Sequence, residues 1–164
     1  MKDLSPELIN AFENHATLER WGHDMYMAIG KRLKAANWAG FSRWFMERAH
    51  EENSTADDIM DYLIRRKADP DYGEVNAPEI PSGPEILEYF QKGFEVQLVH
   101  TAGWEAVHDV CEGCGDKPAC LFVEQYLMSQ VDDEYRFYDA VRRIGLADGD
   151  VAALLKLDHD FGKK

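Results

Sequence analysis

Four stretches of this sequence share one feature: polar residues interrupt the middle of an apolar stripe that repeats at helical spacing. Each interruption is a pair of residues three or four positions apart: Glu19 and His23, Glu52 and Thr55, Gln97 and His100, and Gln130 and Asp133. Residues at this spacing lie on one face of a helix. In a four-helix bundle the pairs would meet at one level of the core and gather carboxylates, amides and imidazoles inside it.

Such a gathering needs a compensating cation, because burying an unpaired carboxylate costs several kcal/mol. Divalent or trivalent metal ions take oxygen and imidazole ligands, and helix bundles build metal sites from inward-facing side chains. The alternative is a buried polar network in which Arg48, one turn before Glu52, neutralises a carboxylate and the histidines only form hydrogen bonds. Since the polar residues occur on all four stretches, we favour a metal centre.

Five of the six histidines divide into two groups. His23 and His100 are the candidate nitrogen ligands, although either could instead be a core histidine with satisfied hydrogen bonds. We expect the others to lie in solvent: His15, His50 and His159.

A second cluster of possible ligands follows the third helical stretch. Cys111-x-x-Cys114-Gly is the pattern of a thiolate knuckle, and Cys120 with His108 could complete a tetrahedral set. Zinc is the metal that this set would suit. The alternative is that the three thiols are free and occupy a surface turn.

The composition restricts the possible partners. The chain has 164 residues, of which 45% are hydrophobic, so we expect a single domain covering residues 1–164. Its net charge of −13 argues against nucleic acid and anionic membranes, since both bind clustered Lys and Arg. No secretory signal is visible, and no apolar run approaches the roughly 20 residues of a membrane span. We therefore expect a cytoplasmic protein that binds cations.

The apolar stripes predict an all-α protein with four long helices and a short fifth, at residues 6–34, 39–66, 84–112, 118–145 and 149–159. Ser5 and Pro6 are typical of a helix start, and Gly145 is the expected stop of the fourth helix. The proline-rich segment between the second and third helices cannot be regular. Its length favours an ordered crossover along the bundle over a flexible linker.

Three segments of the chain resemble the ferritin family. The first helix of bacterial-type non-haem ferritins is resembled by LSPELINAFENHATLE. Their second helix is resembled by GFSRWFMERAHEENSTADDIMDYL, and their fourth helix by FVEQYLMSQVDDEYRF. The resemblance covers nearly the whole chain. It implies a ferritin-like four-helix bundle with a long crossover between the second and third helices, a short C-terminal fifth helix and self-assembly into a shell of twenty-four subunits.

The resemblance also implies a di-iron ferroxidase centre between the helices. Matching the family pattern position by position gives Tyr26 beside the centre and these ligands: Glu19, Glu52 as the bridge between the irons, Gln130 and Asp133. Glu19, Glu52 and Tyr26 would then be the catalytic residues.

Two positions depart from the family pattern. Thr55 replaces the second-helix histidine and Gln97 replaces the third-helix glutamate, so His100 or His23 would supply the missing imidazole to a rearranged site. Haem is not expected, because no methionine stands beside Glu52 at the position of the bacterioferritin haem ligand.

The function that the resemblance implies is iron storage and detoxification. Ferrous iron (Fe2+) would bind inside the bundle, be oxidised by oxygen or peroxide, and be stored as ferric (Fe3+) mineral in a shell whose interior Glu47, Glu51 and Asp132 could line. Two alternatives stay open. One is a ferritin-superfamily oxidoreductase with an altered centre, and the other is a shell subunit without catalysis.

Overall fold

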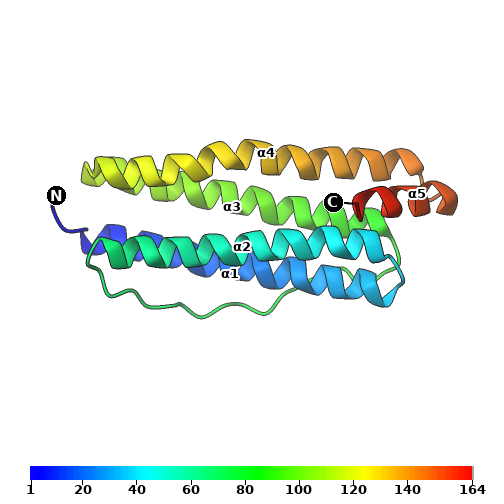
Figure 1. Ribbon diagram of the computed structural model, residues 1–164, viewed down its shortest axis with the longest axis horizontal. Coiled ribbons are helices and arrows are strands. Elements are labelled where there is room, and N and C mark those ends of the chain that lie inside the picture. Colours follow the sequence, from blue (N-terminus) through cyan, green and yellow to red (C-terminus); the bar gives the residue numbers. More distant parts are fainter. Residues whose placement is uncertain (164) are drawn as a thin grey trace.

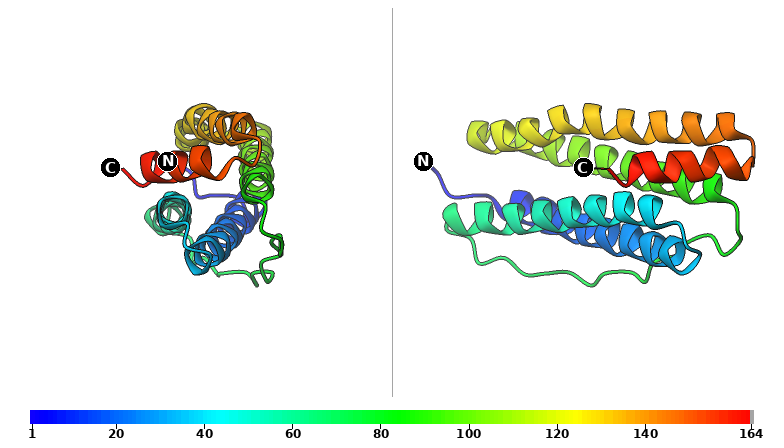
Figure 2. Two further views of the ribbon diagram at one scale, coloured as in Figure 1. Left: turned by 90° about the vertical axis from the view of Figure 1, so that its right-hand side faces the viewer. Right: turned by 45° about the vertical axis from the view of Figure 1, so that its right-hand side comes forward.

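The computed structural model describes residues 1–163 and, in that range, consists of helices without strands. The helices are α1 (Pro6–Ala35), α2 (Ala39–Arg65), α3 (Ile86–Cys114), α4 (Lys117–Ala147) and α5 (Val151–Phe161). The four long helices form a bundle, and the short α5 lies against α2 and α4 near one end (Figures 1 and 2). The all-α fold with a short fifth helix is confirmed.

Local sequence signals explain where most helices begin. Ser5 caps α1 by accepting a hydrogen bond from the Leu8 amide at 3.2 Å, with Pro6 at the first helical position. Asp116 and Asp150 cap α4 and α5 in the same way. These caps satisfy amides that have no partner within the helix.

Several helix ends differ from the prediction, most clearly in α3, α4 and α5. α3 starts at Ile86 and runs to Cys114, where Gly115 takes the left-handed conformation (φ 62°) that ends a helix. The prediction that Gly145 ends the fourth helix was wrong, because α4 continues through it to Ala147. The positive φ angles lie at Asp148 (47°) and Gly149 (76°), and α5 therefore starts later, at Val151.

The crossover between α2 and α3 runs along the bundle as an ordered segment (Figure 1). It is attached to α1 by two backbone amides, with Asp71 donating to Glu13 at 2.9 Å and Gly73 donating to Thr17 at 3.2 Å. These contacts confirm the ordered crossover and exclude the flexible linker.

The core consists of two apolar clusters with a polar level between them. One cluster contains Tyr26, Phe45 and Phe137 towards the α1–α2 turn. The other contains Phe12 and Val123 towards the opposite end of the bundle. Between the clusters lie the buried polar residues Glu19, Glu52, Gln97, His100 and Gln130. Within residues 1–163, none of the helices combines the length and apolar character that a membrane span requires.

Candidate metal centre

Three ligand atoms from three helices converge at the polar level. Glu19 on α1, Glu52 on α2 and His100 on α3 each offer one ligand atom, and these atoms lie within 4.8 Å of one another. His100 Nδ1 is 2.8 Å from Glu52 Oε2 and 3.4 Å from Glu19 Oε2. All three residues are buried. The structure therefore assembles the carboxylate and imidazole cluster that the sequence predicts.

The hydrogen bonding of His100 decides what its second nitrogen can do. His100 Nε2 lies 3.2 Å from the carbonyl oxygen of Leu18, and because a carbonyl can only accept, Nε2 carries the proton. Nδ1 is then the ring nitrogen that faces the two carboxylates and the one that could bind a metal ion. Neither Nδ1 nor Glu19 Oε2 forms a hydrogen bond within residues 1–163. Acceptors so close together suit a cation held between them, so the donor set fits a metal ion.

The two carboxyl groups have opposite pKa shifts. Burial raises the pKa of Glu19 well above its usual value, and the charge of Glu52 raises it further. Burial also acts to raise the pKa of Glu52, but its interactions with neighbouring groups, the charge of His100 first among them, outweigh burial, and the pKa of Glu52 is lowered. Of the two carboxyl groups, Glu19 therefore has the greater tendency to hold a proton, and a bound cation would favour its release.

His15 lies behind Glu19 and is buried, so the expectation that it lies in solvent was wrong. Its Nε2 donates to Glu19 Oε1 at 2.9 Å, which leaves Oε2 for the centre. Burial, followed by the charge of His100, lowers the pKa of His15 to about 3, so the ring is neutral at physiological pH. The missed signal was its position four residues before Glu19, on the same stripe as Leu8 and Phe12.

A pair of amides lies beside the three ligands. Gln97 Nε2 donates to Gln130 Oε1 at 2.6 Å, and Thr101 Oγ1 donates to the same oxygen at 3.1 Å. The hydroxyl of Tyr26 lies 3.2 Å from the Gly93 carbonyl and 3.4 Å from Gln97 Oε1. The two glutamines and the tyrosine therefore satisfy one another without a metal.

Two predicted ligands, Asp133 and His23, do not join the ligand group among the residues that the structure describes. Asp133 is partly exposed, 3.5 Å from Arg136, and burial raises its pKa to about 6. Thr55 Oγ1 donates to the Glu51 carbonyl at 3.0 Å, and His23 pairs with Asp24 at 3.0 Å. As expected, two other histidines are exposed: His50 and His159.

Arg48 does not neutralise the buried carboxylates. It pairs with Glu51 at 3.1 Å and lies 3.9 Å from Glu47, both on the surface of α2. The alternative of a buried polar network therefore lacks the contact on which it depends, a salt bridge between Arg48 and a buried carboxylate.

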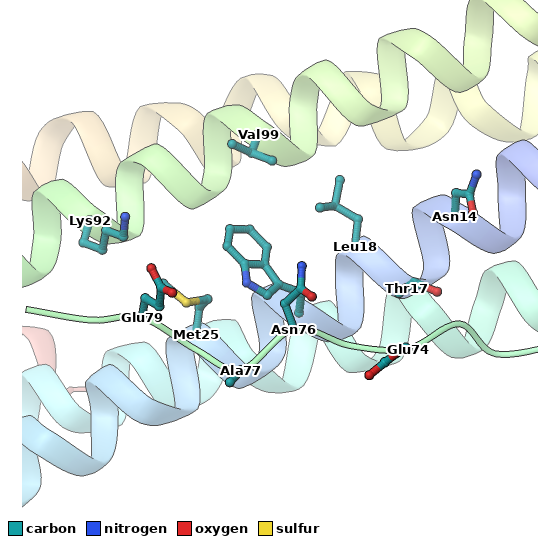
Figure 3. Close-up of a pocket in the computed structure, with 11 residues that line it drawn as sticks. Asn14, Thr17, Leu18, Met25, Glu74, Asn76, Ala77, Glu79, Lys92 and Val99 are labelled. Carbon is teal, nitrogen blue, oxygen red and sulfur yellow. The ribbon is translucent and has the colours of Figure 1, made fainter.

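A cavity of about 690 Å³ lies between α1, α3 and the crossover, but the three ligands are not among its lining residues (Figure 3). Trp21 lines this cavity, and its ring centroid lies 6.3 Å from that of His100. The indole thus lies between the cavity and the centre.

Comparison with known proteins identifies the family. Residues 9–147 match the ferritin-like domain family. The chain belongs to the ferritin family. The chain is 25% identical over 162 residues to a bacterial non-heme ferritin of Bacteroides fragilis strain 638R, covering 98% of this chain and 99% of the relative. It is 24% identical over 161 residues to one of Staphylococcus aureus strain USA300, covering 98% and 96%.

Solved ferritins share the fold. A closed form of the Archaeoglobus fulgidus ferritin, engineered by mutagenesis, has a TM-score of 0.95 at 22% identity, covering 99% of this chain and 98% of that one. An open-pore ferritin from the same archaeon has a TM-score of 0.94 at 21% identity, covering 98% of each chain.

The polar level differs from the ferritin pattern expected from the sequence. Glu19 and Glu52 lie at this level, and the imidazole beside them is that of His100 on α3, since α2 carries Thr55 in place of the expected histidine. Gln97 and Gln130 take the level of the remaining ligands as a hydrogen-bonded pair of amides.

The cysteines do not form a ligand group with His108 among residues 1–163. His108 Nε2 is 3.2 Å from Glu124, and Cys114 Sγ is 3.3 Å from Ser5 Oγ. Cys111 is buried, and burial raises the pKa of its thiol to about 12, which disfavours the thiolate that zinc requires. Zinc at Cys111, Cys114 and Cys120 stays a prediction.

Proposed function

We propose that this ferritin stores iron, and that it binds ferrous iron at Glu19, Glu52 and His100. The observation that carries the proposal is the convergence of three buried ligand atoms from three helices, two of which form no hydrogen bond within residues 1–163. Iron is the substrate in this proposal. Carboxylate oxygens and imidazole nitrogen are ligands that ferrous iron accepts.

The residues around the ligands have distinct parts in this proposal. Glu19 and Glu52 supply negative charge, and Glu19 gives up its proton when the cation binds. His15 orients Glu19 through its other oxygen, and the Leu18 carbonyl keeps His100 Nδ1 free. Asp133, 24% exposed, lies on the solvent side of the polar level and could receive the cation first.

Assembly into a closed shell of twenty-four subunits is part of the same proposal. The described surface carries large exposed apolar side chains on α4 and α5, which a monomer would leave in water: Leu121, Met128, Val131, Tyr135, Leu146, Val151 and Leu155. Contact with further copies would cover them. Light scattering tests this, since a monomer or dimer would contradict the shell. We also propose a cytoplasmic location, where free cysteines stay reduced.

A shell subunit without fast ferroxidase activity is the second candidate. It is favoured by the neutral Gln97–Gln130 pair and by Thr55, whose hydroxyl bonds its own helix. The rate at which the protein oxidises ferrous iron in air, compared with buffer, separates the catalytic form of the proposal from this one.

The test of the site is anaerobic titration with ferrous iron. We expect the parent to bind ferrous iron tightly and Glu52→Ala to lose this tight binding. The carboxylate of Glu19 alone cannot balance the charge of a divalent ion. Glu47→Ala is the matched control, since Glu47 lies on the same helix with its side chain 43% exposed. Equal binding by the parent and Glu52→Ala would refute the proposed site.

A further inference from the structure

We propose that the centre of this ferritin holds one metal ion per chain, bound by Glu19, Glu52 and His100, where the ferritin pattern implies two. This inference rests on the proposed function and specifies the stoichiometry of the same site. The described residues contain a single buried group of three converging ligands.

The second metal position lacks available ligands. Gln97 stands where the pattern implies a carboxylate, and its Nε2 is engaged with Gln130 Oε1 at 2.6 Å. Gln130 Oε1 also accepts from Thr101, so the amide oxygen that could bind a metal is already occupied twice. A second ion would have to break these buried hydrogen bonds and replace them with bonds to neutral amides.

The charge of the cluster also matches one divalent ion. Glu19 and Glu52 together carry two negative charges once both are ionised, and neutral His100 adds none. A second divalent ion would leave two positive charges uncompensated in a buried site, which is unfavourable. Asp133 could offset part of that charge, but it lies near Arg136 at 3.5 Å and outside the ligand group.

The remaining ligand of the family pattern is absent as well. Thr55 stands in place of the second-helix histidine, and its hydroxyl donates to the Glu51 carbonyl at 3.0 Å. The imidazole of His100 cannot serve both positions, because its Nε2 proton is directed to Leu18.

One ion per centre has a chemical consequence. Reduction of O₂ to H₂O₂ consumes two electrons and two protons, whereas one ferrous ion becomes ferric by giving up one electron. A pair of ferrous ions can supply both electrons together, and a single ion cannot. The centre is therefore a binding site that lacks paired two-electron oxidation.

The experiment counts ions by position. A crystal of the protein soaked in Co²⁺, which stays divalent in air, is examined for anomalous scattering between the four helices, so ions on the acidic surface do not enter the count. We expect one peak per chain, beside His100. Two peaks would overturn the single-ion inference while leaving the proposed function intact. A soak without any peak there would overturn both.

Restoring the family's ligands provides a gain-of-site test. The Thr55→His, Gln97→Glu double variant should show a second peak and oxidise ferrous iron at least tenfold faster than the parent. Thr55→His alone, at a partly exposed position, should keep one peak. If the folded double variant still binds only one ion, the Gln97–Gln130 amide pair is not the reason why a second ion is excluded. The count on the unaltered chain decides the inference even if the double variant does not fold.

Discussion

Gly22 on α1 lies directly against the imidazole of His100 on α3, and a Cβ at position 22 would overlap both Cε1 and Nε2 of that ring. The missing side chain lets the ring pack against α1, where Nε2 reaches the Leu18 carbonyl at 3.2 Å. Gly22 therefore leaves the space that His100 needs to lie between Leu18 and Glu52.

Gly22→Ala should weaken metal binding at least tenfold, because the methyl group displaces the imidazole from its place between Leu18 and Glu52. Alanine favours a helix over glycine by about 1 kcal/mol, so the loss would not reflect helix propensity. Titration with Co²⁺ measures the effect. Gly145→Ala is the control, since no atom of residues 1–163 outside its own helix turn lies within 4 Å of its added Cβ, and it should leave binding unchanged. Parent-like affinity in Gly22→Ala would show that the ring position is unimportant.

His15→Leu should lower metal affinity about 10- to 100-fold, the usual effect of removing a partner that orients a ligand. The substitution removes the donor to Glu19 Oε1 and leaves that carboxyl free to rotate. The apolar replacement keeps the site filled but leaves the buried Glu19 Oε1 without a donor, so the melting temperature should fall as well. His23→Leu should bind metal as the parent does, because His23 pairs with Asp24 away from the centre. Equal losses in both variants would argue against an orienting role for His15.

The sequence predicted the site in part. Residue type and helical spacing were enough to place Glu19, Glu52 and His100 at one level, since a helix fixes which residues share a face. Spacing could not show whether Gln97 binds a metal or another amide, because that depends on rotamers and on the facing helix. His15 was missed for the opposite reason: its position on the buried stripe was available, but its residue type suggested solvent.

The helices and their order were predicted more accurately than the residues at which the helices end. The long apolar stripes and the caps at Ser5 and Pro6 are local signals. Gly145 was misleading because it does not adopt a positive φ, whereas Asp148 and Gly149, just after the end of α4, do. Which of these neighbouring residues ends α4 depends on how α5 packs, and a local sequence pattern does not contain that information.

Asp158→Ala should lower the free energy of unfolding by about 1 kcal/mol, the usual value of a helix cap. Trp38, at the N-cap position of α2, provides no side-chain cap. Asp158 on α5 caps α2 instead, because its carboxylate accepts a hydrogen bond from the Phe41 amide at 2.8 Å. Thermal unfolding measures the loss. Asp160→Ala is the control, because Asp160 contacts Lys163 at 3.5 Å and does not cap α2. Equal melting temperatures for the parent and Asp158→Ala would show that α5 does not stabilise the start of α2.

The pair of Arg66 and Asp116 should make stability depend on pH in the acid range. Arg66 donates two hydrogen bonds to Asp116, at 2.8 and 3.2 Å, and joins the end of α2 to the start of α4. The hydrogen bonds from Arg66 are the largest cause of the lowered pKa of Asp116. Because the folded pKa lies below the unfolded value of about 3.9, the stabilisation is complete above that value and is lost as the pH falls through the folded pKa.

Asp116→Asn should therefore cost about 2 kcal/mol at neutral pH, since it leaves a partly buried guanidinium without its charge partner. The difference from the parent should shrink as the pH falls below about 4, where the parent loses the same ion pair. Urea unfolding from pH 7 to acid measures both curves. Asp57→Asn removes one exposed carboxylate on α2 and should follow the parent throughout. Parallel curves for Asp116→Asn and the parent down to the lowest pH would mean that the charge of Asp116 contributes nothing.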